Sequence, residues 1–471
     1  YELLLFFDKP TARALVRWPG MPTPSRLGPP TLAQPSSLAP VEAPLVAKRG
    51  GCGCTPPCIF TYPAPDTNLF LRDGRTVRWV ENVNGRLITF ADAIQRSSHN
   101  TWDGDCADFF VIPSPIFTTA SGDKINSSDR EMVKLFEYLA HAYPFWNATA
   151  GKGLVRHLLL NPCDHGPLDC EFSRSSDADD LRPDIAPRDR RRKFAFVEFN
   201  GVPQLSWFIP ALDIRVPSTP VHESGPLCGL HQLKPATALG VLRAQSPWTR
   251  PEPERTAFYA GERRHYRFFW SGTSHSGVRN DVFRHVNRSG YVLHDTWTKY
   301  AGGSRAGAER LPRALNLTQP TWFVEAMASS DFCFSPTGQS EGDSDRYLPA
   351  ILYGCVPVFA WADEEGPYAD LIPWRTISLR APPKHLPAVL DNVSDAQLGA
   401  MRRAMRDVWT RLIYRAGVGA DALDLLAVMN PSAAADGSPR VQLAHPDAIA
   451  SLFDVLAFRL GAEAEREWKR V

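Results

Sequence analysis

The chain has 471 residues, 44% of them hydrophobic, and its 52 Lys and Arg residues balance 51 Asp and Glu residues. The formal net charge of +1 excludes a general electrostatic attraction to nucleic acid or to anionic membranes. The sequence contains no run of about 18 apolar residues, the length that a membrane-spanning helix needs. Because the length exceeds that of one ordinary domain, the sequence predicts two domains.

The first predicted segment, residues 1–55, is rich in proline and is expected to form a largely disordered stem. Residues 56–235 then alternate apolar strands with a helix over 129–142. The predicted strands span 58–65, 107–113, 156–162, 194–199 and 211–217. This alternation is typical of an α/β layer, and the near-continuous apolar runs are typical of parallel strands buried on both faces.

A second proline-rich break follows, and residues 236–262 are expected to form an extended linker. Residues 263–420 repeat the α/β pattern, and residues 421–471 are expected to form a C-terminal helical segment. Ser394 and Gln397 fit the capping box of a helix. The predicted elements of this half are a strand, loop and helix over 266–286, strands at 331–335 and 354–361, and helices at 394–412 and 445–460.

Nine cysteines include a cluster in the segment "CGCTPPC" at residues 52–58. Zinc and disulfide bonds are both compatible with this cluster. Disulfide bonds are favoured, because no paired histidine spacing completes a metal site. Cys163 and Cys170 bracket a short loop and could pair, whereas the apolar neighbours of Cys333 and Cys355 indicate buried free thiols.

Five Asn-x-Ser/Thr sequons could accept N-linked glycans, at Asn126, Asn147, Asn287, Asn316 and Asn392. Together with the clustered cysteines, they favour the lumen of the secretory pathway. The sequence starts at Tyr1 rather than at methionine, so an N-terminal anchor or signal could lie outside it.

Two loops of the second α/β unit, residues 263–420, have the composition of an anion-binding site. The small-residue loop "GTSHSG" precedes a predicted helix that carries Arg279, and the loop "SPTGQSEGDSD" ends at Arg346. Helix N-termini and arginine forks bind phosphates, and loops that follow neighbouring parallel strands meet where open α/β sheets hold ligands. Spacing alone also allows ordinary turns with solvated arginines.

Several acidic and imidazole groups are candidates for metal binding or proton transfer. Asp-x-Asp triplets begin at Asp103, Asp177 and Asp343, but we expect no metal site, because none directly follows a strand. His157 and Asp164 lie at the ends of a predicted strand, where a base could deprotonate an acceptor hydroxyl. An aspartate that bonds its own loop backbone is an equally compatible interpretation of Asp164.

The ordered motifs resemble the exostosin-like glycosyltransferases, family 47. The resemblance covers about residues 58–415 and is strongest over 268–374. In the second unit it rests on "DFCFSPTG", "SDRYLPAILYGCVPV" and "GPYADLIPW", and in the first on "YPFWNAT", "RHLLLNPCDHG" and "LDIRVP".

This resemblance implies the GT-B arrangement of two Rossmann-like domains facing across an interdomain cleft. It implies an inverting transfer from a UDP-sugar to a glycan or glycoprotein acceptor, with no cofactor and no essential metal. It also implies the lumenal part of a type II membrane protein of the Golgi, and a homo- or hetero-oligomer with another transferase is compatible with it.

The resemblance also assigns the donor site. By it, Gly272 and Arg279 line the phosphate side, and Gly338, Ser344 and Arg346 lie at the donor nucleotide and diphosphate. Asp164 and His157 are the candidate catalytic residues. Two positions depart from the family pattern: Pro349 replaces an acid suited to ribose hydroxyls, and Arg156 replaces the acid of an Asp-His pair.

The leading hypothesis is therefore a UDP-sugar-dependent transferase in polysaccharide or glycoprotein biosynthesis. The two departures support an alternative, a non-catalytic glycan-binding or partner subunit that keeps the transferase fold. A metal-dependent GT-A transferase that uses an Asp-x-Asp triplet is a third hypothesis.

Overall fold

The computed structural model describes most of the chain after residue 51. The described residues are 52–63, 75–79, 88–113, 115–119, 124–125, 129–148, 155–161, 186, 190–198, 208–217, 235–250, 253–272, 277–286, 288–295, 315, 317–336, 346–414 and 447–468. Among them, no helix is long and apolar enough to cross a membrane.

The first unit is built on a five-stranded parallel sheet whose strand order is the order of the chain. Its strands are β1 (Ile59–Thr61), β3 (Phe109–Ile112), β6 (His157–Asn161), β7 (Phe194–Glu198) and β8 (Ile214–Arg215). Every residue of β3 and β7 is buried, as the apolar runs FFVI and FAFV predict for a sheet covered on both faces, and the charged Glu198 that ends β7 is buried with them.

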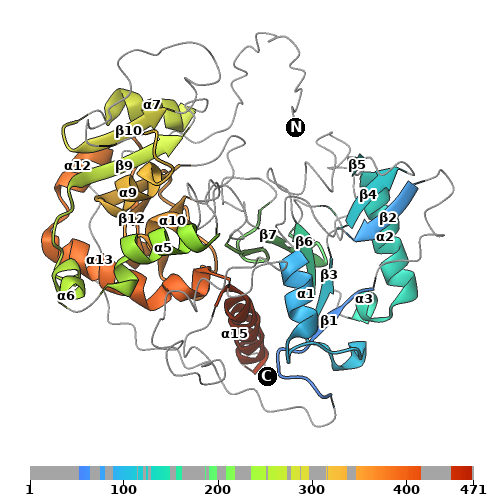
Figure 1. Ribbon diagram of the computed structural model, residues 1–471. Coiled ribbons are helices and arrows are strands. Elements are labelled where there is room, and N and C mark those ends of the chain that lie inside the picture. The colour runs from blue at the N-terminus through green and yellow to red at the C-terminus, as the bar shows by residue number, and fades with distance from the viewer. Residues whose placement is uncertain are drawn as a thin grey trace, which may run out of the picture. The chain divides into compact units, whose positions relative to one another are not determined.

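The second unit holds another five-stranded parallel sheet, in the order β10-β9-β11-β12-β13. Figure 1 labels β9, β10 and β12 of this sheet. Its strands are β9 (Tyr266–Gly272), β10 (Tyr291–Asp295), β11 (Ser330–Ser335), β12 (Val356–Phe359) and β13 (Leu379–Arg380). The chain places β10 on one side of β9 and then crosses to the other side for β11. The strand order therefore reverses between β9 and β11.

Helices connect and cover these strands. Those of the first unit are α1 (Ile88–Arg96), α2 (Asp129–Ala142) and α3 (Phe145–Ala148). Those that follow are α5 (Pro235–Gln245), α6 (Glu254–Tyr259), α7 (Gly277–His285), α9 (Trp322–Ala328), α10 (Tyr347–Leu352), α11 (Trp374–Ile377), α12 (Leu386–Asp391), α13 (Asp395–Val408) and α15 (Ala448–Trp468). The two parallel sheets with their helices confirm the predicted α/β class.

One sheet was not predicted from the sequence. It is a small antiparallel sheet of β2 (Arg75–Trp79), β4 (Pro115–Thr119) and β5 (Lys124–Ile125). The helix over 129–142 and the capping box of α13 are confirmed: the Ser394 hydroxyl accepts from the Gln397 backbone, and the Gln397 side chain accepts from the Ser394 backbone.

The structure corrects the expected extended conformation of residues 236–262. Most of this segment is helical, in α5, in a 3-10 turn at Pro247–Thr249 and in α6. Trp248 and Phe258 are buried, and the Trp248 indole donates to the Ile351 carbonyl at 3.1 Å. The segment packs against α10, and its prolines begin short helices instead of extending the chain.

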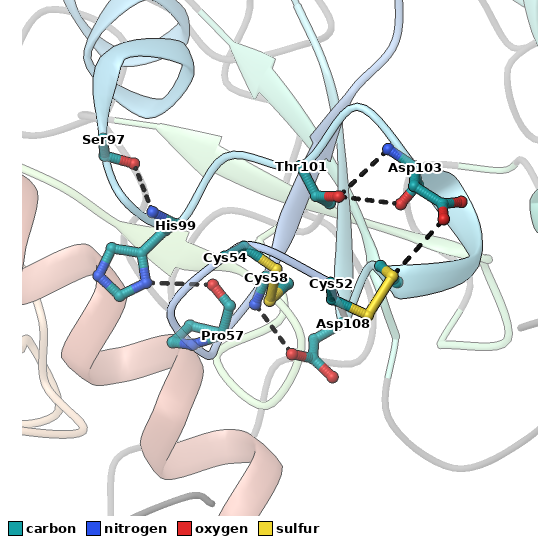
Figure 2. The surroundings of a disulfide bond; sticks show 10 residues. Cys52, Cys54, Pro57, Cys58, Ser97, His99, Thr101, Asp103 and Asp108 are labelled. Atoms are coloured by element: carbon teal, nitrogen blue, oxygen red, sulfur yellow. Dashed lines mark hydrogen bonds between the residues drawn. A yellow bond between two sulfur atoms is a disulfide. The ribbon is translucent and has the colours of Figure 1, made fainter. Parts of the chain in front are cut away.

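Three disulfide bonds lie in the described residues: Cys52–Cys106, Cys54–Cys58 and Cys333–Cys355. The first two confirm the disulfide framework at the start of the first unit, and they bring residues 52–55 out of the predicted stem (Figure 2). The third shows that the prediction of free thiols at Cys333 and Cys355 is wrong. Cys163 and Cys170 lie outside the described residues.

Candidate functional site

The strand order of the second sheet marks one place for a ligand. In an open parallel sheet, a crevice forms at the carboxyl ends of the two strands between which the strand order reverses. Those strands are β9, which ends at Gly272, and β11, which ends at Ser335. The first sheet has no such reversal among its described strands, because its strands follow the chain order.

Gly272 and Arg346 meet at the carboxyl ends of these two strands, β9 and β11. A side-chain carbon added at Gly272 would lie 2.9 Å from Nη2 of Arg346 and 3.3 Å from the ring of Trp270. Arg346 caps the start of α10, the helix that follows β11. The absence of a side chain at Gly272 therefore lets the guanidinium group lie directly over the end of β9.

Arg279 is the second cation of this cluster. It lies in the first turn of α7 and is only 6% exposed. Burial, followed by the nearby charge of Arg346, lowers the pKa of Arg279 to about 9. Two guanidinium groups that repel each other in a desolvated crevice would be stabilised by an anion that carries more than one charge.

A third arginine reaches this region from the first unit and was missed in the sequence. Arg215 ends β8, is 5% exposed, and places its guanidinium carbon 5.3 Å from the ring centre of Tyr347, the residue after Arg346. It also donates to the Glu365 carbonyl. The indication was present in "LDIRVP", where a charged residue ends an apolar strand, but its partner in the other unit cannot be read from the sequence.

His157 does not join the donor-side residues. It begins β6, at the opposite edge of the first sheet from the carboxyl ends, and is 1% exposed. Its ring packs against Trp146 at 4.5 Å and Phe110 at 5.1 Å, and Nδ1 is 3.3 Å from the Tyr62 hydroxyl. Burial lowers its pKa to about 3, so the packed ring is neutral at neutral pH, and the role of His157 as a base stays a prediction.

The remaining predicted site residues, Asp164, Gly338 and Ser344, lie outside the described residues, as do the triplets that begin at Asp177 and Asp343. Asp103 is described, and its carboxylate accepts the Asp105 backbone N–H at 3.0 Å, which caps a 3-10 turn beside the Cys52–Cys106 bond (Figure 2). No group of three or more metal-ligating side chains occurs in the part of the chain that the structure describes.

The two departures from the family pattern are each accommodated by their surroundings. Arg156 forms an ion pair of 2.8 Å with Glu463 of α15 and donates to the Asp108 carbonyl at 3.1 Å. Its charge reversal is thus matched by an acid from the C-terminal helix. Pro349 is buried in the first turn of α10, where a missing backbone N–H costs no helical hydrogen bond.

Comparison with known proteins places this geometry in a family. The family model described as the exostosin GT47 domain matches residues 235–395. A probable glucuronosyltransferase of Oryza sativa subsp. japonica is 33% identical over 341 residues, which cover 70% of this chain and 68% of that protein. A probable glycosyltransferase of Arabidopsis thaliana is 25% identical over 358 residues, and the match covers 74% of this chain and 62% of that protein's length.

Among solved structures, that of WaaG, a glycosyltransferase involved in lipopolysaccharide biosynthesis, aligns with 80% of this chain and 98% of its own. Its sequence identity of 14% and TM-score of 0.24 are too low to indicate a shared architecture. The assignment rests instead on the matched family model, the relatives and the ordered motifs. The chain belongs to the exostosin GT47 family of glycosyltransferases.

Proposed function

We propose that this chain transfers a sugar from a UDP-sugar donor to a glycan or glycoprotein acceptor, with inversion at the anomeric carbon. The observation that supports it most is the meeting of Gly272, Arg279 and Arg346 at the point where the strand order reverses. A nucleoside diphosphate carries more than one negative charge, and such an anion would offset the repulsion between these two arginines.

The same residues suit the chemistry of the transfer. As the bond between the anomeric carbon and the diphosphate oxygen breaks, negative charge develops on the departing UDP. Arg279 and Arg346 stabilise that charge in a partly desolvated crevice, where electrostatic interactions are strengthened. The acceptor hydroxyl forms the new bond from the opposite face and releases its proton, for which Asp164 stays our candidate base.

The donor sugar is proposed only as a class. Relatives include probable glucuronosyltransferases and a probable xylosyltransferase, so UDP-glucuronic acid and UDP-xylose belong in any donor panel. We further propose that the transfer needs no cofactor and no metal ion. Undiminished activity in excess EDTA is the expected result, and a loss that Mn²⁺ or Mg²⁺ restores would contradict it.

We also propose that the protein works in the Golgi lumen, as part of a type II membrane protein that pairs with itself or with another transferase. Disulfide bonds persist in such an oxidising compartment, and the sequon residues Asn147 and Asn392 are both exposed. Glycosidase treatment of secretory-pathway material should shift the mobility of the chain.

The test of the main proposal uses purified protein and a panel of UDP-sugars, with release of UDP as the readout. We expect slow hydrolysis of at least one donor and faster UDP release when a matching glycan acceptor is present. Absence of both UDP release and a UDP-induced shift in melting temperature would refute the transferase proposal and favour a non-catalytic subunit. The ion pair between Arg156 and Glu463 removes one argument for that alternative.

A further inference from the structure

A cavity of about 320 Å³ lies where three distant segments of the chain meet. Its walls come from residues 208–215 at the end of β8, from residues 363–370 after β12, and from Arg459 of α15. Ligand cavities in proteins measure roughly 300–1,000 Å³, so this one is suited to a small group such as one sugar ring.

Tyr368 holds the three walls together. Its backbone N–H donates to the Arg215 carbonyl at 3.0 Å, and its hydroxyl donates to the Ala448 carbonyl at 2.5 Å. Its φ of 53° lies in the left-handed region, which is unusual for a residue other than glycine and persists where the surroundings fix it. The walls are therefore fixed before any ligand arrives.

The carboxylates of the lining are held in place without using their full capacity to accept hydrogen bonds. Asp370 accepts from Arg459 at 2.8 and 3.0 Å, and Glu365 is bridged by Arg380 at 3.0 Å and Arg375 at 3.1 Å. An ionised carboxylate offers about four acceptor positions, so oriented oxygens stay available for ligand hydroxyls.

The charge of the lining selects among sugars. The lining holds two arginines and four acids, and the guanidinium groups of Arg215 and Arg459 already donate to backbone carbonyls of the walls. The acids are Asp213, which pairs with Arg192, and Asp363, Glu365 and Asp370. A uronate or sulfate in this cavity would face these acids, whereas a neutral sugar would donate hydroxyls to them. Phe208 and Pro210 supply an apolar surface against which the C–H groups of a sugar ring can pack.

The cavity also lies next to the donor residues. Arg215 belongs to its lining and at the same time packs over Tyr347, which directly follows Arg346. We propose that this cavity is a subsite for one neutral sugar unit of the acceptor glycan. The proposal rests on the proposed transferase function, because it is the position beside the donor diphosphate that makes the bound sugar an acceptor.

A steric pair of variants tests the cavity. Ala369 lines it and is exposed, so Ala369→Trp should fill it without disturbing the core, and Ala362→Trp changes an exposed residue of the same loop outside the lining. Ligand-observed NMR with the full chain and saturating UDP would follow xylotetraose, cellotetraose, galactotetraose and trigalacturonate.

We expect at least one neutral tetrasaccharide to bind the unaltered chain and Ala362→Trp, and to bind Ala369→Trp at least tenfold more weakly. Trigalacturonate should bind more weakly than that neutral ligand. Equal binding to both tryptophan variants, no binding of any neutral ligand, or preferred binding of trigalacturonate would each overturn the proposal.

A charge variant gives a second readout. Asp363→Asn should reduce the preference for the neutral ligand over trigalacturonate severalfold, and Asp407→Asn, an exposed acid of α13, should leave it unchanged. An unchanged preference in Asp363→Asn would contradict the charge argument. Failure of UDP itself to bind would count against the transferase proposal, while the tetrasaccharide comparison would still decide the cavity.

Discussion

The two parallel sheets have the same number of strands but differ in strand order. In the first, successive strands are always added on the same side, whereas in the second the chain reverses after β10. Among the described strands, the reversal that is typical of nucleotide-binding sheets occurs in the second sheet, and Arg279 and Arg346 meet there. The first sheet instead supplies Arg215 and one wall of the cavity of about 320 Å³.

A second contrast separates two sides of the second sheet: the carboxyl edge, where its strands end, and the amino edge, where its strands begin. At the carboxyl edge, Arg279 and Arg346 lie close together. At the amino edge, Arg263, Arg267 and Arg402 surround the buried carboxylate of Asp331 at 3.7, 3.0 and 2.9 Å. The arginines of the amino edge stabilise the fold, and those of the carboxyl edge are proposed to bind substrate.

The largest effect is expected at the amino edge. Asp331→Asn would leave the buried guanidinium group of Arg402 without its carboxylate and should lower the free energy of unfolding by about 3–5 kcal/mol. Chemical denaturation measures the loss. UDP affinity of the folded protein should stay within about twofold, and a large drop in that affinity would contradict the division between the two edges.

The next effect concerns the carboxyl edge. Arg346→Ala removes the proposed charge-assisted hydrogen bonds to the diphosphate, worth about 1.5–3 kcal/mol each, and should weaken UDP binding by roughly 10- to 150-fold for each bond lost. Calorimetric titration would measure it. Arg288→Ala is the matched control, because Arg288 is half-exposed and pairs with Asp391. Equal UDP affinity in both variants would refute the donor site.

A smaller effect is expected from His157, whose protonation should lower the free energy of unfolding in acid. Its pKa is about 3 in the folded chain and about 6.5 when unfolded, so the unfolded state binds the proton first as the pH falls below 6.5. Stability from the neutral ring is complete above pH 6.5 and declines toward pH 3. By pH 4.5 the loss should reach about 2–3 kcal/mol, at about 1.4 kcal/mol per pH unit.

His157→Gln tests this linkage, because glutamine does not titrate. The difference in unfolding free energy between the unaltered chain and the variant should shrink steadily from pH 6.5 to 4.5. A constant difference over that range would mean that His157 is not the group that takes up the proton. A pH profile of donor hydrolysis that the substitution leaves unshifted would support its exclusion from catalysis.

The sequence predicts the strands of the first parallel sheet and β9, β11 and β12 of the second, because short apolar runs between turn residues are typical of buried strands. It does not predict β10 and β13. It also predicts that Gly272 and Arg346 approach each other, since they lie at the ends of neighbouring strands of one sheet.

The Cys333–Cys355 bond was missed because apolar neighbours indicate burial but not register. In the sheet, Cys333 lies opposite Pro357, which brings Cys355 within reach. Arg215 was missed because its contact with Tyr347 joins residues far apart in the chain.

The smallest effect tests whether the first unit departs from its family in function or only in packing. Arg156 is partly exposed and Glu463 is buried at its side, so solvent partly screens their ion pair, which should contribute about 1 kcal/mol. Arg156→Glu alone places two acids together and should lower the melting temperature, and adding Glu463→Arg should restore most of the loss by reversing both charges.

Donor hydrolysis should stay unchanged in the double variant. A loss of hydrolysis there, with stability restored, would give Arg156 a role beyond anchoring α15 and would revive the argument that its departure from the family pattern affects catalysis.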